Sequence, residues 1–352
     1  MNLTMIGYKE EMKMELANFP KKECVLGRVA LEHKHMYRVW TDEGELLCEV
    51  SGKFAFAASR REDFPAVGDW VILSSRKEEG TGTIHSILPR FSKFSRKAAG
   101  NTAEEQIIAA NVETVFLVNS LNDDLNLRRI ERYLLLAWES GANPVIILSK
   151  ADLCEDVEEK VAAVESVALG VPVIPVSAEM NEGLEKLKPY LGEGKTVALL
   201  GSSGVGKSTL TNTLLGENKQ AVKEIREDDD KGRHTTTHRE LVLLPGGAVL
   251  IDTPGMRELQ LWESQDGLAG AFSDIEELSA ACRFRDCRHT DEPGCAVREA
   301  ISNGDLPEER LSSYNKLQRE LAYIERKADK RAQSEEKKQW KAIHKQIKTK
   351  KK

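Results

Sequence analysis

Short segments in which apolar and polar residues alternate fill the first 95 residues of the chain. Turn residues separate each segment from the next. Alternation with a period of two is typical of strands that bury one face, and short strands at this spacing indicate a small antiparallel barrel. Residues 1–95 are therefore predicted to form an OB-like barrel, with strands at Cys24–Ala30, Met36–Trp40, Leu46–Val50, Asp69–Leu73 and Gly82–Ile87.

The pattern changes near residue 110, where continuous runs of Val, Ile and Leu alternate with segments of helical periodicity. Such runs are typical of parallel strands that helices cover on both faces. Residues 96–265 are therefore expected to form an α/β domain. The expected strands are Val112–Val118, Pro144–Leu148, Val171–Val176, Thr196–Leu200, Leu241–Leu244 and Ala248–Ile251, and the expected helices are Leu127–Glu139, Glu182–Leu191 and Lys207–Leu215.

Helical patterns dominate the rest of the chain, so residues 266–325 are expected to form a mainly α domain and residues 326–352 a helical tail. Of the 352 residues, 40% are hydrophobic and 31% are charged, as in soluble globular proteins. No run of 18 apolar residues occurs, so no membrane segment is expected. The N-terminus lacks the apolar core of a signal peptide, which favours the cytoplasm, and a monomer is the default expectation.

The net charge of −6 conceals an asymmetry, because residues 326–352 carry 12 Lys and Arg against 3 Asp and Glu. A basic arm on an acidic body suggests a polyanion partner. A solvated terminal helix accounts for the same composition equally well. The barrel is expected to bind RNA, as many barrels of its kind do, although a fold alone does not establish a function.

The segment from Gly201 to Ser208 has the spacing G-x-x-x-x-G-K-S of a Walker A phosphate-binding loop. Its glycines let backbone amides face the phosphates, and the helix that follows presents its N-terminus to the anion. Lys207 is expected to reach the β- and γ-phosphates, and Ser208 to ligate Mg²⁺. The candidate nucleotide contacts here are Gly201, Ser202, Ser203, Gly204, Val205, Gly206, Lys207, Ser208 and Thr209.

A second motif, D-x-x-G, begins at Asp252 directly after an apolar run and 44 residues after Ser208. This position places a carboxylate on the Mg²⁺ side of the phosphates and the Gly255 amide near the γ-phosphate. In many GTPases a Gln that orients the attacking water follows this glycine. Here the residue is Met256, so hydrolysis requires another group or a partner that supplies one.

Between these motifs lies Lys231–His238, with the sequence KGRHTTTH. Its acidic flank and Gly232 suggest a switch loop. A threonine of such a loop normally ligates Mg²⁺, and Thr236 is the candidate among Thr235–Thr237. His234 is a candidate for positioning water, while His238 fits an incidental polar position better. With Lys207, His234 and Thr236 form the candidate catalytic set.

The base-reading motif is predicted at Ser149, Lys150, Ala151 and Asp152, after an apolar strand. Asp152 can accept two hydrogen bonds from guanine, a pair that adenine does not offer. Ser177 and Ala178, at the next strand end, match the segment that donates to guanine O6. In an ordinary GTPase the base-reading motif follows the phosphate-binding loop. Here it comes about fifty residues earlier, which predicts a circularly permuted GTPase domain over residues 96–265.

Cys282, Cys287, His289 and Cys295 lie within 14 residues. In a reducing compartment such a cluster indicates a metal rather than disulfides. Three thiolates and one imidazole complete a closed tetrahedral shell, which suits one structural Zn²⁺ ion. The other cysteines, Cys24, Cys48 and Cys154, are scattered and are expected to be small core or surface residues.

Together these motifs resemble the RsgA/YjeQ family of bacterial ribosome-assembly GTPases. The matching segments are GSSGVGKSTLTNTLL, GRHTTTHREL, LIDTPGMREL and CRFRDCRHTDEPGC, and the resemblance covers nearly the whole chain. It implies an OB barrel, a circularly permuted GTPase domain and a zinc-binding helical domain. It also implies that GTP hydrolysis to GDP and phosphate, with Mg²⁺, is stimulated by the small ribosomal subunit and its rRNA, in late maturation of that subunit.

The family relies on a histidine just before the threonine run, which falls on His234. The chain departs from the family pattern at Ser149. Two alternatives remain open. The chain is a different P-loop enzyme, such as an ATPase or a nucleotide kinase, if Asp152 does not read guanine. It is an RNA-binding module with a vestigial site if neither GTP nor GDP binds.

Overall fold

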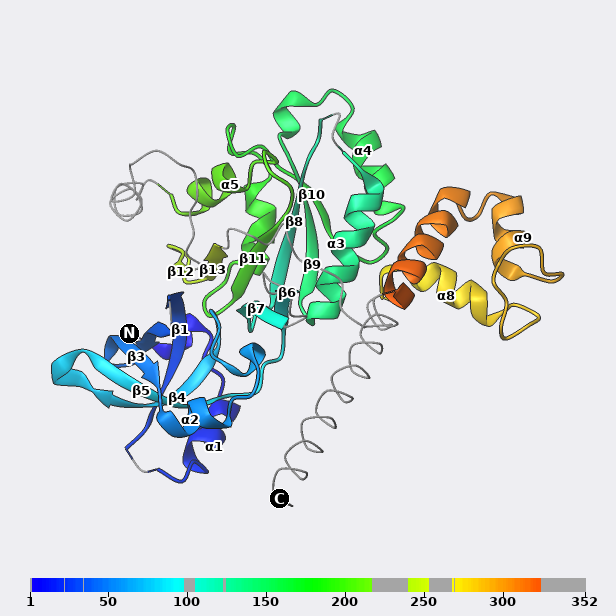
Figure 1. The fold of residues 1–352 in the computed structure, drawn as a ribbon. Helices are drawn as coiled ribbons and strands as arrows, with labels where there is room; N and C mark the ends of the chain where they lie inside the picture. The colour runs from blue at the N-terminus through cyan, green and yellow to red at the C-terminus, as the bar shows by residue number, and fades with distance from the viewer. Residues whose placement is uncertain are drawn as a thin grey trace, which may run out of the picture. The chain divides into compact units, whose positions relative to one another are not determined.

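The computed structural model describes residues 2–21, 23–33, 35–97, 105–122, 125–216, 240–252, 268 and 270–323. The chain forms two compact units, Met1–Gln260 and Leu261–Lys352. The first unit contains a barrel and an α/β sheet, and the described part of the second is helical (Figure 1). No helix in the described ranges is long and apolar enough to span a membrane.

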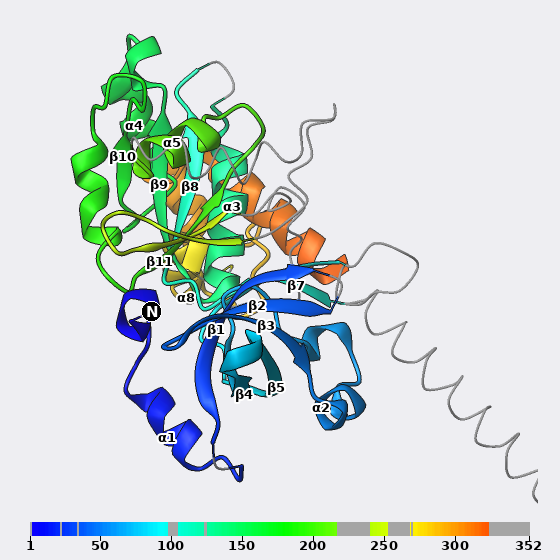
Figure 2. The same ribbon diagram turned by 90° about the vertical axis from the view of Figure 1, so that its left-hand side faces the viewer.

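Five strands of the first unit close into a barrel (Figure 2). They are β1 (Val25–His33), β2 (Met36–Thr41), β3 (Gly44–Val50), β4 (Trp70–Arg76) and β5 (Thr81–Ile87). Their order is β1-β2-β3-β5-β4, and β4 pairs back onto β1 to close the ring. Alternate side chains point inward and form the barrel core of Val29, Tyr37, Val39, Leu46, Cys48, Val71, Leu73 and Ile84. The predicted barrel is confirmed.

The short helix α2 (Gly52–Ala57) packs against β5 of the barrel. The first unit also contains single turns of 3-10 helix: η1 (Leu3–Ile6), η2 (Arg61–Asp63), η3 (Lys77–Glu79) and η4 (Ala151–Leu153).

The α/β sheet follows the order β10-β9-β8-β11-β13-β12. Its strands are β8 (Thr114–Ser120), β9 (Asn143–Ser149), β10 (Val173–Pro175), β11 (Thr196–Leu200), β12 (Glu240–Leu243) and β13 (Val249–Asp252). Neighbours from β10 to β13 are parallel, and only β12 runs antiparallel to its neighbour β13. Each expected strand is present, with ends that differ by a few residues at most, so the predicted parallel sheet is confirmed.

Helices cover both faces of this sheet. Figure 1 shows α5 (Lys207–Leu214) on one side and α3 (Leu127–Ser140) with α4 (Val157–Glu165) on the other. Alternate strand residues such as Phe116, Val118 and Val197 pack with Leu187 and Leu210 on the α5 face. Strands buried on both faces explain why the sequence shows continuous apolar runs instead of alternation.

The helix expected at Glu182–Leu191 is instead the 3-10 helix η5 (Leu184–Tyr190). Gly183 precedes it with a left-handed backbone, φ 75°, and Pro189 lies inside it. Proline has no N–H and clashes with the preceding turn, so a regular α-helix does not form there. This part of the prediction is wrong.

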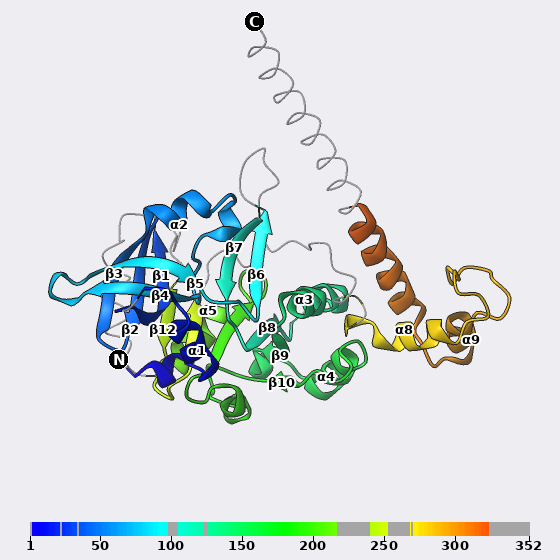
Figure 3. The same cartoon turned by 90° about the horizontal axis from the view of Figure 1, so that it is seen from below.

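Several elements have no counterpart in the sequence-based expectation, among them helices α2 and α4. Helix α1 (Glu11–Ala17) precedes the barrel, and β6 (Lys93–Lys97) pairs antiparallel with β7 (Glu105–Ala110) as a separate two-stranded sheet (Figure 3). The expected boundary between residues 95 and 96 falls within β6. That boundary stays a prediction, as does the boundary between residues 265 and 266, which lies outside the described residues.

The barrel and the α/β sheet are joined within the first unit. Leu31 of β1 pairs with Glu240 of β12, which makes the two sheets continuous. Arg28 of β1, which is 1% exposed, donates hydrogen bonds to the carbonyl oxygens of Ile6, Gly68 and Asn111. Burial lowers the pKa of Arg28 to about 10, so its guanidinium stays charged at neutral pH.

In the second unit, α8 (Ser273–Ala280) and α9 (Ala296–Asn303) pack together, and residues 308–323 are helical. Arg310, which is 2% exposed, binds both carboxylate oxygens of Asp274, at 2.5 and 2.8 Å. The ring of Phe272 meets that of Tyr314 edge to face. These contacts hold the helix at 308–323 against α8.

Candidate functional site

The predicted nucleotide-binding residues gather at one edge of the α/β sheet. Parallel strands end at the same edge, and β11 lies between β8 and β13 in the middle of the sheet. Ser149 at the end of β9 pairs with Ser120 at the end of β8, and Leu200 at the end of β11 pairs with Leu117. Ligands of open α/β sheets bind at this edge, outside the carboxyl ends of the strands.

The phosphate-binding loop connects β11 to α5 with the backbone that its glycines allow. A Cβ atom on Gly201 would lie 2.2 Å from the carbonyl oxygen of Val118, so only glycine fits there. Gly206 caps α5 with a left-handed φ of 90°, a conformation that glycine adopts without strain. Ser208 is exposed at the start of the helix. The loop and the helix end together have the backbone geometry that anion-binding loops require.

Lys207 folds back over its own loop. Its Nζ donates to the carbonyl oxygens of Gly201 at 2.6 Å and Ser202 at 2.5 Å. These contacts hold the ammonium group beside the backbone amides of the loop, so positive charge is concentrated where phosphates are expected to bind.

Two residues of the predicted base-reading motif, at the end of β9, contact the same phosphate-binding loop. The hydroxyl of Ser149, a buried residue, lies 2.6 Å from the carbonyl oxygen of Val205 and 3.2 Å from that of Asn119. Lys150 donates from Nζ to the carbonyl oxygen of Gly204 at 2.8 Å. Two residues predicted to face the base therefore contact the phosphate-binding loop.

The two segments predicted to read guanine lie side by side. The amide of Ala151 donates to the carbonyl oxygen of Val176 at 3.1 Å, and Asp152 is exposed next to it. Ser177 is buried and its Oγ accepts a hydrogen bond from the Met180 amide at 3.1 Å. Thr213 of α5 donates to the carbonyl oxygen of Ala178 at 3.5 Å. The geometry thus connects Ala178 to the helix that follows the phosphate-binding loop.

Several predicted site residues lie outside the described residues. They are His234, Thr236 and Gly255, together with His238 and Met256 of the same two segments. Asp252 is the last residue of β13 and pairs with Glu240 of β12, which places its backbone at the same sheet edge as the phosphate-binding loop.

Tyr133, which belongs to no predicted motif, also reaches this edge. The hydroxyl of Tyr133, on α3, lies 3.2 Å from the hydroxyl of Ser202 in the phosphate-binding loop. The residues are 69 positions apart. Only the helical periodicity of 127–139 pointed to this region, and periodicity does not say which side chain reaches a loop.

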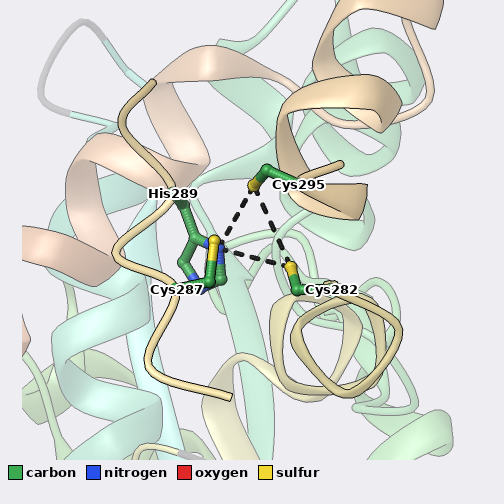
Figure 4. Close-up of side chains that lie close together, drawn as sticks. All are labelled: Cys282, Cys287, His289 and Cys295. Atoms are coloured by element: carbon green, nitrogen blue, oxygen red, sulfur yellow. Dashed lines mark hydrogen bonds between the residues drawn. The ribbon is translucent and has the colours of Figure 1, made fainter. Parts of the chain in front are cut away.

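The four predicted metal ligands converge in the second unit (Figure 4). The Nδ1 atom of His289 lies 3.7 Å from Sγ of Cys282 and 3.4 Å from Sγ of Cys295, and these two sulfurs are 3.9 Å apart. With Cys287, all four ligand atoms lie within 4.8 Å of one another. Zinc–sulfur bonds of about 2.3 Å and zinc–nitrogen bonds of about 2.0 Å place tetrahedral ligand atoms about 3.5–3.8 Å apart. The group therefore fits a zinc ion.

Neighbouring groups orient these ligands. The Nε2 atom of His289 lies 3.0 Å from Oγ of Ser279, which leaves Nδ1 to face the sulfurs. The Arg298 amide, in the first turn of α9, donates to Sγ of Cys295 at 3.4 Å, and Arg298 Nε binds the carbonyl oxygen of His289 at 2.9 Å. Burial lowers the pKa of His289, which favours the neutral ring that binds metals. Partners of this kind fix the ring orientation at metal sites.

The loop between the ligands has its own anchor. Glu292 accepts hydrogen bonds from the amides of Arg288 at 3.1 Å and Thr290 at 2.8 Å. Hydrogen bonds from the amides of Glu292 itself, Arg288 and Thr290 lower the pKa of Glu292 to about 2, so it stays ionised. The acidic insert thus shapes the turn that presents His289.

Comparison with known proteins agrees with this geometry. A family model described as RsgA GTPase matches residues 87–262. The small ribosomal subunit biogenesis GTPase RsgA 1 of Oceanobacillus iheyensis is 49% identical over 349 residues, 99% of each chain. The protein named small ribosomal subunit biogenesis GTPase RsgA from Methanosarcina acetivorans is 48% identical over 323 residues, 92% of this chain and 86% of that protein.

Two solved structures share the fold. The crystal structure of YjeQ from Thermotoga maritima superposes with a TM-score of 0.66 at 31% identity, covering 85% of this chain and 99% of that one. The structure of YloQ, described as a circularly permuted GTPase, has a TM-score of 0.64 at 25% identity, covering 87% of this chain and 97% of that one. With the permuted order of strands and motifs found here, these similarities show that the chain belongs to the family of RsgA GTPases.

Proposed function

We propose that this GTPase binds the small ribosomal subunit and assists its late maturation, hydrolysing GTP to GDP and phosphate with stimulation by the subunit. The observation that carries the proposal is the loop held by Lys207, Ser149 and Lys150 at the sheet edge, in a chain whose relatives are named small ribosomal subunit biogenesis GTPases. The nucleotide chemistry comes from the loop, and the ribosomal role comes from the names of the relatives.

In the proposed reaction, Lys207 and the loop amides neutralise the β- and γ-phosphates while water attacks the γ-phosphorus in line. Ser208, Thr236 and Asp252 would hold Mg²⁺, which supplies further neutralisation of the phosphates. The proposed contacts also include Thr209 at the start of α5 and the Gly255 amide near the γ-phosphate. Met256 cannot orient water, so slow turnover is expected in the absence of the subunit, and His234 is assigned that role once the subunit binds.

Guanine recognition is proposed for Asp152, which would accept hydrogen bonds from N1 and N2, with Lys150 along the base plane. The backbone at Ser177 and Ala178 would donate to O6. The hydrogen bond from Ala151 to Val176 supports this assignment, because it brings the two segments together at the same sheet edge.

We further propose one structural zinc ion held by Cys282, Cys287, His289 and Cys295, since three thiols and an imidazole leave no open coordination position. The barrel at 1–95 is proposed to contact rRNA, and the basic tail at 326–352 to approach the same polyanion. The permuted GTPase domain spans 96–265 and the zinc domain 266–325 in this proposal, and the chain acts as a cytoplasmic monomer.

GTP turnover with and without purified small subunits tests the proposal. Small subunits are expected to raise the rate well above that of the free protein, and large subunits are the matched control that should not. His234→Ala is expected to keep the free rate and lose most of the stimulation. Equal rates with and without small subunits would contradict the ribosomal role, and full stimulation of His234→Ala would contradict the role of that histidine.

A further inference from the structure

The phosphate-binding loop is held at several points by residues that precede it in the sequence. Gly201 is pressed against the Val118 carbonyl of β8. Gly204 and Val205 receive hydrogen bonds from Lys150 and Ser149 on the β9 side. Ser202, at the second position of the loop, takes no part in these contacts with β8 and the β9 side. Its side chain contacts a different element.

That element is α3. Asn126 caps its start by accepting a hydrogen bond from the Arg129 amide at 3.1 Å, and the helix packs against β8 and β9. Ile130 and Leu134, next to Tyr133 in the helix, are buried. Because these buried neighbours fix the helix on the sheet, the partly buried Tyr133 ring points its hydroxyl to a defined place, 3.2 Å from Oγ of Ser202.

Ser202 is also the residue that connects this contact to the reactive end of the loop. Its carbonyl oxygen accepts a hydrogen bond from Lys207 Nζ at 2.5 Å. A shift of Ser202 would therefore move an acceptor of the ammonium group that faces the phosphates. The path runs from the Tyr133 hydroxyl through Ser202 to Lys207.

We propose that Tyr133 is a positioning residue for the phosphate-binding loop, which its hydroxyl fixes through Ser202 in the conformation that cradles the phosphates. The inference rests on the proposed nucleotide site. A loop ordered before the ligand arrives does not have to be ordered by the ligand, and this preorganisation increases affinity. Both GDP and GTP use the cradle, so Tyr133 should strengthen their binding by the same factor.

The test compares Tyr133→Phe, which removes only the hydroxyl, with Ser202→Ala and with the double variant. Loss of one such hydrogen bond is expected to raise the Kd of both GDP and a GTP analogue by about threefold to tenfold. KM for GTP should rise by a similar factor and kcat should stay within about twofold, because the lost binding is uniform. The double variant should be no weaker than the weaker of the two single variants, since the two hydroxyls form one contact.

Tyr190→Phe is the matched control. Tyr190, the last residue of η5, packs edge to face on Phe116 of β8 in the same unit, and its variant should keep the Kd of the unmodified protein. If Tyr133→Phe lowers the nucleotide-free melting temperature but leaves both Kd values unchanged, Tyr133 is merely structural and the proposal is wrong. Additive losses in the double variant would also overturn it. If the unmodified protein binds neither nucleotide, the proposed function fails instead.

Discussion

Ser149 stands where base-reading motifs usually have Asn or Thr, and its short side chain still reaches the phosphate-binding loop. Its hydroxyl lies 2.6 Å from the Val205 carbonyl oxygen, and Lys150 binds the next carbonyl back along the loop, that of Gly204. These side chains hold the loop, whereas Asp152 is exposed on η4 and is available to a ligand. We therefore propose that Asp152 recognises the base, while Ser149 holds the loop.

Asp152→Asn is expected to lower the affinity for GTP about tenfold to a hundredfold, because the amide replaces an ionised acceptor of two guanine hydrogen bonds. Xanthosine triphosphate, which has a carbonyl oxygen where guanine has its amino group, should gain affinity in this variant. Competition binding against a labelled GDP measures both effects. Asp156→Asn, a change in the same exposed loop, is the control. Unchanged GTP affinity in Asp152→Asn would favour a P-loop enzyme of another specificity.

The helices α8 and α9 are connected through a segment that is mostly exposed and contains the metal ligands. Between Cys282 and Cys295, the described side chains with little exposure are those of His289 and Cys295 themselves. A segment with so few buried apolar groups cannot order itself by hydrophobic burial. We infer that zinc binding supplies the free energy that orders this segment, as in other small metal domains.

Cys287→Ser is expected to reduce the zinc content from one ion per chain to near zero and to increase hydrogen exchange through 282–295, because three ligands hold zinc much more weakly than four. Zinc is measured by elemental analysis and exchange by mass spectrometry. Cys154→Ser removes a partly exposed cysteine of the first unit and should change neither. Since every described residue of the nucleotide site lies in the first unit, GDP binding should survive Cys287→Ser. Full zinc content in Cys287→Ser would contradict the assigned ligand set.

Within the first unit, one attachment of the barrel lies at the amino ends of strands that carry the nucleotide site at their carboxyl ends. Arg28 of the barrel binds the carbonyl oxygen of Asn111, just before β8. Glu113 accepts a hydrogen bond from the Thr196 amide, the first residue of β11, at 2.8 Å. The strands β8 and β11 therefore connect the barrel attachment at one end to the phosphate-binding loop at the other.

Arg28→Met is expected to destabilise the first unit by about 3–5 kcal/mol, because three buried carbonyl groups lose their donor. The Arg28 guanidinium also lies 5.8 Å from the ring of Trp70, so Trp fluorescence during urea unfolding should report the change. Arg76→Met, which removes an exposed ion pair with Glu79, should cost less than about 1 kcal/mol. An Arg28→Met midpoint equal to that of Arg76→Met would show that Arg28 does not hold the barrel in place.

Elements with a local cause could be predicted from the sequence. Two-residue alternation predicted the barrel strands, and continuous apolar runs predicted the parallel sheet. Motif spacing predicted the phosphate-binding loop and the four candidate metal ligands, which lie together in the structure. The position of the base-reading motif before that loop also predicted the circular permutation. Each of these signals lies within a few neighbouring residues or in their order along the chain.

Contacts between residues far apart in the sequence could be found only in the folded structure. Ser149 and Val205 are 56 residues apart in the sequence, and Tyr133 and Ser202 are 69 residues apart. No local sequence pattern therefore predicts either contact. The hairpin of β6 and β7 and the buried Arg28 depend in the same way on groups from several segments. The departure at η5 is different, because its cause, Pro189, is local. A side chain can hold a loop only if the fold brings the two close together, and they come close only after the sheet has formed.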